Sequence, residues 1–164
     1  MTNHDENDHS SHGDTPAVHI PPPVIVAVLL LGGLGVDYFL KTGFGGAAAW
    51  LKYIGIGLCV FGFAIAIWCA LLYRKARTSI LPHTADSNMI DTGPFGMSRN
   101  PIYLSMLIVF VGICLALNAP AALLFIPPTY LALRYYVIAR EEAYLTRRFG
   151  DDYTSYQSRV RRWI

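Results

Sequence analysis

The chain has 164 residues, of which 54 % are hydrophobic and 15 % charged, and its mean hydropathy is +0.38. This composition lies outside the usual range of soluble proteins and indicates a membrane protein with room for one compact unit. The net charge is only +2, and most basic residues flank apolar runs instead of lining one face together with aromatic residues. That pattern excludes a typical nucleic-acid-binding domain.

The first 20 residues are rich in Asp, Asn, His and Ser and carry almost nothing apolar to bury. They predict a disordered acidic tail, followed by one membrane domain over 21–164. The tail has no basic stretch followed by an apolar run and a cleavage site, so we expect no removable signal peptide. Its histidines match no helical face, and we therefore expect no metal site; they are His4, His9, His12 and His19.

Four apolar runs, 23–40, 53–73, 101–117 and 121–139, are long enough to cross about 30 Å of hydrocarbon as helices with snorkelling ends. Lipid offers no partners to backbone groups, and continuous runs without alternating polarity fit helices and not barrel strands. The sequence therefore predicts an all-α integral-membrane bundle of about four transmembrane helices plus short C-terminal helices.

Local features predict how these helices pack. Only residues 118–120 separate the third and fourth runs, which predicts a tight antiparallel hairpin. Gly62, Ala66 and Ala70 recur every four residues and could form a small-residue stripe for close packing, although plain filler explains them almost as well. The prolines at 127 and 128 remove two backbone donors and predict a kink.

Basic residues predict the orientation in the membrane. Only Lys41 and Lys52 lie between the first two runs, whereas ten basic residues lie on the opposite side. The positive-inside rule then places both termini, the loop between the second and third runs and any water-side chemistry in the cytoplasm. The ten residues are Arg74, Lys75, Arg77, Arg99, Arg140, Arg147, Arg148, Arg159, Arg161 and Arg162.

The segment SRNPIYL begins the third run. Asn100 is a good N-cap and Pro101 a good first helical residue, but neither explains the preceding Arg99. A helix N-terminus attracts a carboxylate or phosphate, and a cation beside it is unfavourable unless an anion is present. This segment is therefore a candidate ligand-binding entrance.

Glu141 and Glu142 lie where the fourth run leaves the membrane. No basic side chain stands three or four residues from either one, so we expect a partner from elsewhere, either Arg99 or a cationic ligand, with a solvated surface pair as the alternative. Beyond them, Gly150 predicts a helix stop and Asp151 the cap of a short helix on the membrane surface.

The two segments together resemble the membrane-embedded methyltransferases that include isoprenylcysteine carboxyl methyltransferase and the phospholipid N-methyltransferases. Those proteins carry a "GPY…(S/V)R(H/N)PxY" stretch, a helical hairpin, and then "EE…L…FG…Y…Y…V.R". The resemblance covers about 78–164, which would form the cofactor-binding half. The matching residues are Gly93, Pro94, Phe95, Ser98, Arg99, Asn100, Pro101 and Tyr103, then Glu141, Glu142, Leu145, Phe149, Gly150, Tyr153, Tyr156, Val160 and Arg161.

This resemblance implies S-adenosyl-L-methionine as the cofactor and a lipophilic acceptor, such as a prenylated or phospholipid-like substrate, that arrives through membrane lipids. It implies a cofactor pocket lined by Arg99, Asn100, Pro101 and Tyr103, with Glu141 and Glu142 on the amino group or ribose. Because the sulfonium methyl is already activated, alignment of the acceptor is the main task.

Arg134 lies inside the fourth run, where it either orients an anionic acceptor or belongs to a structural ion pair, and we assign it with Glu141 as a catalytic candidate. Tyr130, Tyr135 and Tyr136 could shield the sulfonium or form an interfacial belt. His83 and Asp91 are weaker candidates for closing the pocket.

Many relatives have His where this chain has Asn100, and Asn cannot shuttle a proton near neutral pH, so a general-base role does not transfer. A carboxylate or thiol acceptor, which needs less help from a base, is therefore mildly favoured. An NADPH-dependent membrane lipid or sterol reductase and a non-enzymatic scaffold are the alternatives, and the oligomeric state is open.

Overall fold

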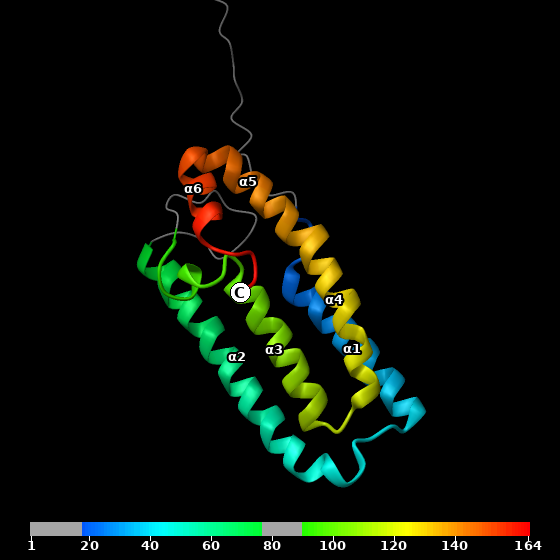
Figure 1. The fold of residues 1–164 in the computed structure, drawn as a ribbon. Coiled ribbons are helices and arrows are strands. Elements are labelled where there is room, and N and C mark those ends of the chain that lie inside the picture. The colour runs from blue at the N-terminus through cyan, green and yellow to red at the C-terminus, as the bar shows by residue number, and fades with distance from the viewer. Residues whose placement is uncertain (1–17, 77–89) are drawn as a thin grey trace, which may run out of the picture.

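The computed structural model describes residues 18–76 and 90–164, and within these ranges the chain is helical with no β-strand (Figure 1). The all-α prediction is confirmed. The predicted N-terminal tail, apart from its last three residues, and His83 lie outside the described ranges. The elements are α1 (Pro22–Leu40), η1 (Gly45–Ala47), α2 (Ala48–Ala76), η2 (Gly93–Gly96), α3 (Pro101–Ala116), η3 (Pro120–Phe125), α4 (Ile126–Ala132), the π-helical η4 (Leu133–Ile138), α5 (Ala139–Phe149) and α6 (Asp151–Arg159).

Three helical stretches in the described part are long and apolar enough to cross a membrane, namely Pro22–Leu40, Gly45–Ala76 and Pro120–Phe149. The chain is therefore an integral membrane protein. The fourth predicted span is α3, whose 16 residues are apolar but shorter. At 1.5 Å per residue α3 is about 24 Å long, which spans most of the hydrocarbon.

Glycines bring α2 and α3 into close contact. A Cβ atom built on Gly55 would lie 2.5 Å from the backbone nitrogen of Ala116, and one built on Gly112 would lie 2.7 Å from the carbonyl oxygen of Gly55. Gly62 faces Ser105 in the same way, since a Cβ atom built on Gly62 would lie 2.9 Å from the carbonyl oxygen of Ser105. Of the predicted stripe, Gly62 lies at this contact, whereas Ala66 and Ala70 are only half-buried; the buried residues of α2 are Gly55, Gly62 and Cys69.

A short turn joins α3 to η3, and α3 contacts both η3 and α4, as the predicted hairpin requires. The packing is less tight than expected, because α3 packs most extensively against α2, and η3 packs against α1. Gly33 of α1 allows this second contact, since its built Cβ would lie 3.1 Å from Cα of Ala122. In Figure 1 the green α3 and the yellow α4 diverge from their turn. A short loop keeps two consecutive helices close at one end, whereas small residues determine which helices pack closely along their length.

The two prolines at 127 and 128 fall in the first turn of α4, where a backbone N–H has no partner within the helix. The change of geometry therefore lies outside the prolines, as the 3₁₀ turns of η3 before them and the π-helical η4 after them. These irregular turns belong to one helical stretch from Pro120 to Phe149.

At the C-terminus, Gly150 with φ of 52° ends α5 as expected. Asp151 is not the cap of the next helix, because Gly150 takes the cap position and Asp151 is the first residue of α6. The helix ends at Arg159, and the last five residues are not helical. They return to the start of α3 instead of extending a surface helix, as the red C-terminal segment in Figure 1 shows.

Candidate functional site

The start of α3 is held by the C-terminal segment, defined here as residues 160–164. The backbone N–H of Arg99 donates to the carbonyl of Arg161 over 2.9 Å, and the Asn100 side-chain amide donates to the carbonyl of Arg162, also over 2.9 Å. The Ser98 hydroxyl donates to the same Arg162 oxygen over 3.3 Å. Asn100 thus occupies the N-cap position, but its side chain does not cap the helix, contrary to expectation. Within 18–76 and 90–164, the first turn of α3 therefore has no side-chain cap.

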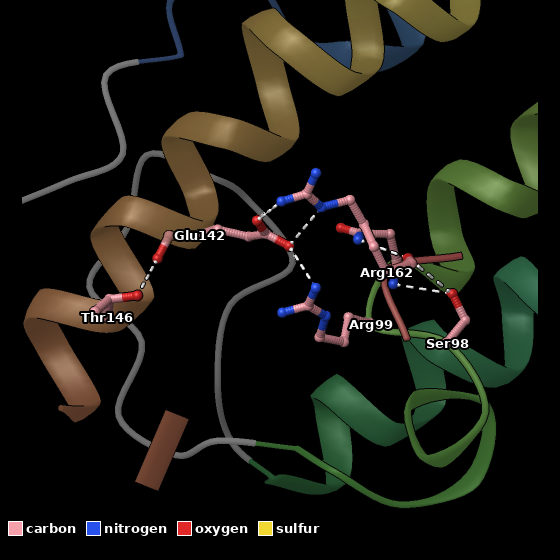
Figure 2. A network of polar contacts seen from close by, with 6 residues as sticks. Ser98, Arg99, Glu142, Thr146 and Arg162 are labelled. Carbon is pink, nitrogen blue, oxygen red and sulfur yellow. Dashed lines mark hydrogen bonds and ion pairs between the residues drawn. The ribbon is translucent and has the colours of Figure 1, made fainter. Parts of the chain in front are cut away.

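Glu142 of α5 lies between two arginines from distant parts of the chain (Figure 2). One carboxylate oxygen is 3.5 Å from Nη2 of Arg99, and Arg162 donates to both oxygens, with 3.0 Å between its Nε and Oε1. The side chains of Arg99 and Glu142 are each only 12 % exposed. Arg99 and Glu142 are therefore largely removed from solvent. The burial of Glu142 does not match the alternative in which Glu141 and Glu142 form a solvated surface pair.

The neighbouring Glu141 contacts α3 directly. Its Oε1 accepts a hydrogen bond from the Tyr103 hydroxyl over 2.5 Å, and Tyr103 is only 8 % exposed. Pro101 is also buried at the first helical position. The structure therefore brings Arg99, Asn100, Pro101, Tyr103, Glu141 and Glu142 together at the junction of α3, α5 and the C-terminal segment.

Arg162 is the functional candidate that sequence reasoning missed. Its hydrogen bond with Glu142 raises the pKa of the Arg162 guanidinium, so this side chain stays positively charged at neutral pH. The signal in the sequence was an arginine-rich terminus following two glutamates without local partners. It was not decisive, because a run of basic residues next to a membrane is also typical of a surface helix.

The short helix α6 supports this junction through buried tyrosines. The Tyr156 hydroxyl donates to the carbonyl of Phe95 over 2.6 Å, which ties α6 to the η2 turn before α3. Burial, followed by the charge of Glu142, raises the pKa of Tyr153 to about 12. Asp91 lies farther out, in an exposed ion pair with Arg159 over 3.9 Å.

Arg134 lies in the π-helical η4 and makes different contacts. Its Nη1 donates to the Tyr130 hydroxyl over 2.9 Å, and its guanidinium lies 6.0 Å and 5.5 Å from the ring centroids of Tyr130 and Tyr135. The Tyr130 ring in turn lies 5.1 Å from that of Trp163. No ion pair joins Arg134 to any residue in 18–76 or 90–164, so the expected alternative of a structural ion pair is not seen there.

A family model described as phospholipid methyltransferase matches residues 50–152, from α2 to the start of α6. This chain belongs to the phospholipid methyltransferase family. The matched region contains Arg99 and both glutamates but ends before Arg162 and Trp163. Family membership thus confirms the resemblance that the two sequence segments indicated.

Two relatives are similar to this family member. One is an uncharacterized protein of Haemophilus influenzae, 40 % identical over 63 residues, which make up 38 % of this chain and all of that protein. The other is the nickel-cobalt-cadmium resistance protein NccN of Alcaligenes xylosoxydans xylosoxydans, 27 % identical over 138 residues. That match covers 84 % of this chain and 59 % of NccN, so the chain spans only part of that relative's length.

The residues at the junction fit the chemistry of an amino-acid-like nucleotide cofactor. The Nε atom of Arg99 is buried and has no hydrogen-bond partner in the described part, and the first turn of α3 has no side-chain cap, so donors for a carboxylate are present. Glu141 and Glu142 supply acceptors for an ammonium or a ribose hydroxyl. The described residues contain no group of three or more His, Cys, Asp or Glu side chains that could hold a metal ion.

Proposed function

We propose that this protein is an S-adenosyl-L-methionine-dependent methyltransferase that acts on a lipophilic acceptor at the cytoplasmic face of the membrane. The observation that carries the proposal is the junction of Arg99, Tyr103, Glu141 and Glu142, which joins two distant polar segments of a phospholipid methyltransferase family member. When bound, the cofactor supplies an activated methyl group.

The residues of the junction have distinct proposed roles. Arg99 and the uncapped start of α3 would bind the cofactor carboxylate, with Asn100, Pro101 and Tyr103 lining the same pocket. Glu141 and Glu142 would accept hydrogen bonds from its amino group or ribose. Since Glu142 is already bound to Arg162, a cationic ligand must compete with that arginine. Positioning by these fixed side chains, and not acid–base chemistry, would be their main contribution.

The acceptor would enter sideways from the bilayer, because a lipophilic molecule is concentrated there. The polar cofactor would enter from water. Isoprenylcysteine-like carboxylates and phospholipid-like headgroups both fit this description. We propose Arg134 and Glu141 as the catalytic residues. Arg134 would orient an anionic acceptor, and Glu141 would lie beside the groups that react. The ten basic residues that the sequence predicts on one side of the membrane support the cytoplasmic orientation.

The test is calorimetry of the detergent-purified full chain with S-adenosylhomocysteine, with NADPH and with buffer. We expect binding of S-adenosylhomocysteine alone. Glu142→Ala and Arg99→Ala should each weaken it by about tenfold or more, because each removes a charged partner from a largely buried site. Exposed residues on neighbouring elements provide matched controls, Asp151→Asn for the glutamate and Arg159→Ala for the arginine.

Selective binding of NADPH would instead support a membrane reductase. Binding of neither ligand by folded protein would favour a scaffold. Unchanged affinity in both Glu142→Ala and Arg99→Ala, with the controls also unchanged, would contradict the site assignment while leaving the family membership intact.

A further inference from the structure

Arg134 is an arginine within the membrane-spanning stretch Pro120–Phe149 whose hydrogen-bonding capacity is mostly unused. A guanidinium carries five N–H donors, and only the Tyr130 hydroxyl accepts one from it among the residues of 18–76 and 90–164. Its other neighbours are the faces of two tyrosine rings. A charged side chain in an apolar membrane helix is costly unless it is paired, and is therefore typical of a functional site.

The aromatic residues beside Arg134 add further donors. The Tyr130 hydroxyl accepts from Arg134 and keeps its own O–H for donation. The Tyr130 ring packs on Trp163, whose indole Nε1 is buried without a hydrogen-bond partner in the described chain. We call Arg134, Tyr130 and Trp163 the Arg134 cluster. It presents N–H and O–H groups and no carboxylate, which is the donor set expected for an oxyanion.

The surroundings of the cluster indicate how an oxyanion would reach it. Arg134 lies seven residues before Glu141 in the same apolar helical stretch. Next to it, Tyr135 is 63 % exposed and Leu131 is 49 % exposed, on a surface that faces lipid in a membrane. An ion dissolved in water would have to leave water to arrive there, whereas the headgroup of an amphiphile can move in laterally.

We propose that the Arg134 cluster binds the oxyanion, a phosphate or carboxylate, of an amphiphilic ligand. This inference rests on the proposed function, in which that amphiphile is the methyl acceptor. Trp163 extends the site beyond the part of the chain that the family model matches. Through Trp163 the cluster also adjoins Arg162, the partner of Glu142, so an oxyanion at Arg134 and a cofactor at Glu142 would be neighbours.

The experiment is a calorimetric titration of the detergent-solubilised full chain with three probes. They are dioctanoyl phosphatidic acid, the uncharged dioctanoylglycerol and inorganic phosphate. We expect the phosphatidic acid to bind, and the other two probes to bind at least about tenfold more weakly. Arg134→Gln should weaken the binding of phosphatidic acid by about tenfold or more, since charge-assisted hydrogen bonds are lost.

Arg140→Gln is the matched control, because Arg140 lies on the same helical stretch, is exposed, and donates to the carbonyl of Tyr136. It should retain the affinity within about twofold. Trp163→Phe keeps the ring and removes only the indole N–H, so it should weaken binding less than Arg134→Gln. Should Arg134→Gln fail to fold, Arg134→Lys keeps the charge but loses the planar fork and should still reduce affinity.

Wild-type affinity in Arg134→Gln, or equal binding of dioctanoylglycerol, would overturn the inference. Equal binding of inorganic phosphate would overturn the assignment to an amphiphile. The titration with S-adenosylhomocysteine is independent of these results. Failure of that ligand to bind would contradict the proposed function, whereas loss of phosphatidic acid binding in Arg134→Gln with S-adenosylhomocysteine binding intact would support both proposals.

Discussion

Asp37 is a buried acidic residue in α1 whose role the sequence did not indicate. It is 8 % exposed, and its Oδ1 accepts the backbone N–H of Ala121 over 2.9 Å as well as the Thr42 hydroxyl. It therefore satisfies a donor in the first turn of η3 that would otherwise have no partner within the helix. This single side chain joins α1 to the beginning of the last membrane stretch.

We predict that Asp37→Ala lowers the free energy of unfolding by about 1–3 kcal/mol, because the Ala121 N–H loses its main acceptor in a buried place. Asp37→Asn keeps an oxygen at the same position and should lose less. Reversible denaturant unfolding in detergent, followed by circular dichroism, measures both changes. Equal stability of Asp37→Ala and the wild type would show that the hydrogen bond contributes nothing.

The sequence predicted a distant partner for Glu141 and Glu142, either Arg99 or a cationic ligand, because neither glutamate has a basic residue within reach on its own helix. It did not predict the side-chain role of Asn100, since Asn is one of the residues that most often cap a helix. Nor did it predict Arg162, because nothing local to the last five residues shows that they return to α3. Local chemistry identified which groups needed partners. Only the tertiary structure shows that Arg162 joins Arg99 and Glu142 in a group of three charged side chains.

At the scale of elements, hydropathy located α1 and α3 closely, because a long apolar run has few alternatives in lipid. The predicted runs 53–73 and 121–139 are shorter than the observed stretches Gly45–Ala76 and Pro120–Phe149. The pairing of those helices was harder to predict. The turn of residues 118–120 indicated an α3–α4 hairpin, yet the extensive contact is between α2 and α3. That contact depends on Gly55 of α2 and Gly112 of α3. Because these glycines lie on two different helices, no spacing within one helix indicates that they face each other.

We predict that Gly55→Ala destabilises the α2–α3 contact. The added methyl group would lie 2.5 Å from the Ala116 nitrogen and from the Gly112 carbonyl oxygen, and these backbone atoms cannot rotate away as a side chain can. Overpacking of this kind costs about 1–3 kcal/mol. Thermal unfolding in detergent, followed by circular dichroism, measures the loss.

Gly57→Ala on the same helix is the matched control. A Cβ at Gly57 meets nothing within 4 Å, so this variant should be as stable as the wild type or slightly more stable, because alanine favours a helix over glycine. If both variants behaved alike, the close approach of α2 to α3 would not depend on Gly55.

At the scale of the whole molecule, the C-terminal segment connects parts that are otherwise separate. Its carbonyl groups bind the segment before α3, the Arg162 guanidinium binds α5, and the Trp163 ring packs on α4. The two proposed ligand sites therefore share one short stretch of chain.

We predict that Arg162→Ala loosens the C-terminal segment, because the variant loses the two hydrogen bonds to Glu142 while the backbone contacts to Asn100 and Ser98 remain possible. Amide hydrogen exchange of residues 160–164 should become faster, and exchange within α2 and α3 should not change. Arg161→Ala is the control, because Arg161 is exposed and its contact with Arg99 uses only the backbone. Equal acceleration in the two variants would mean that general loss of charge, and not the ion pair with Glu142, holds the segment in place.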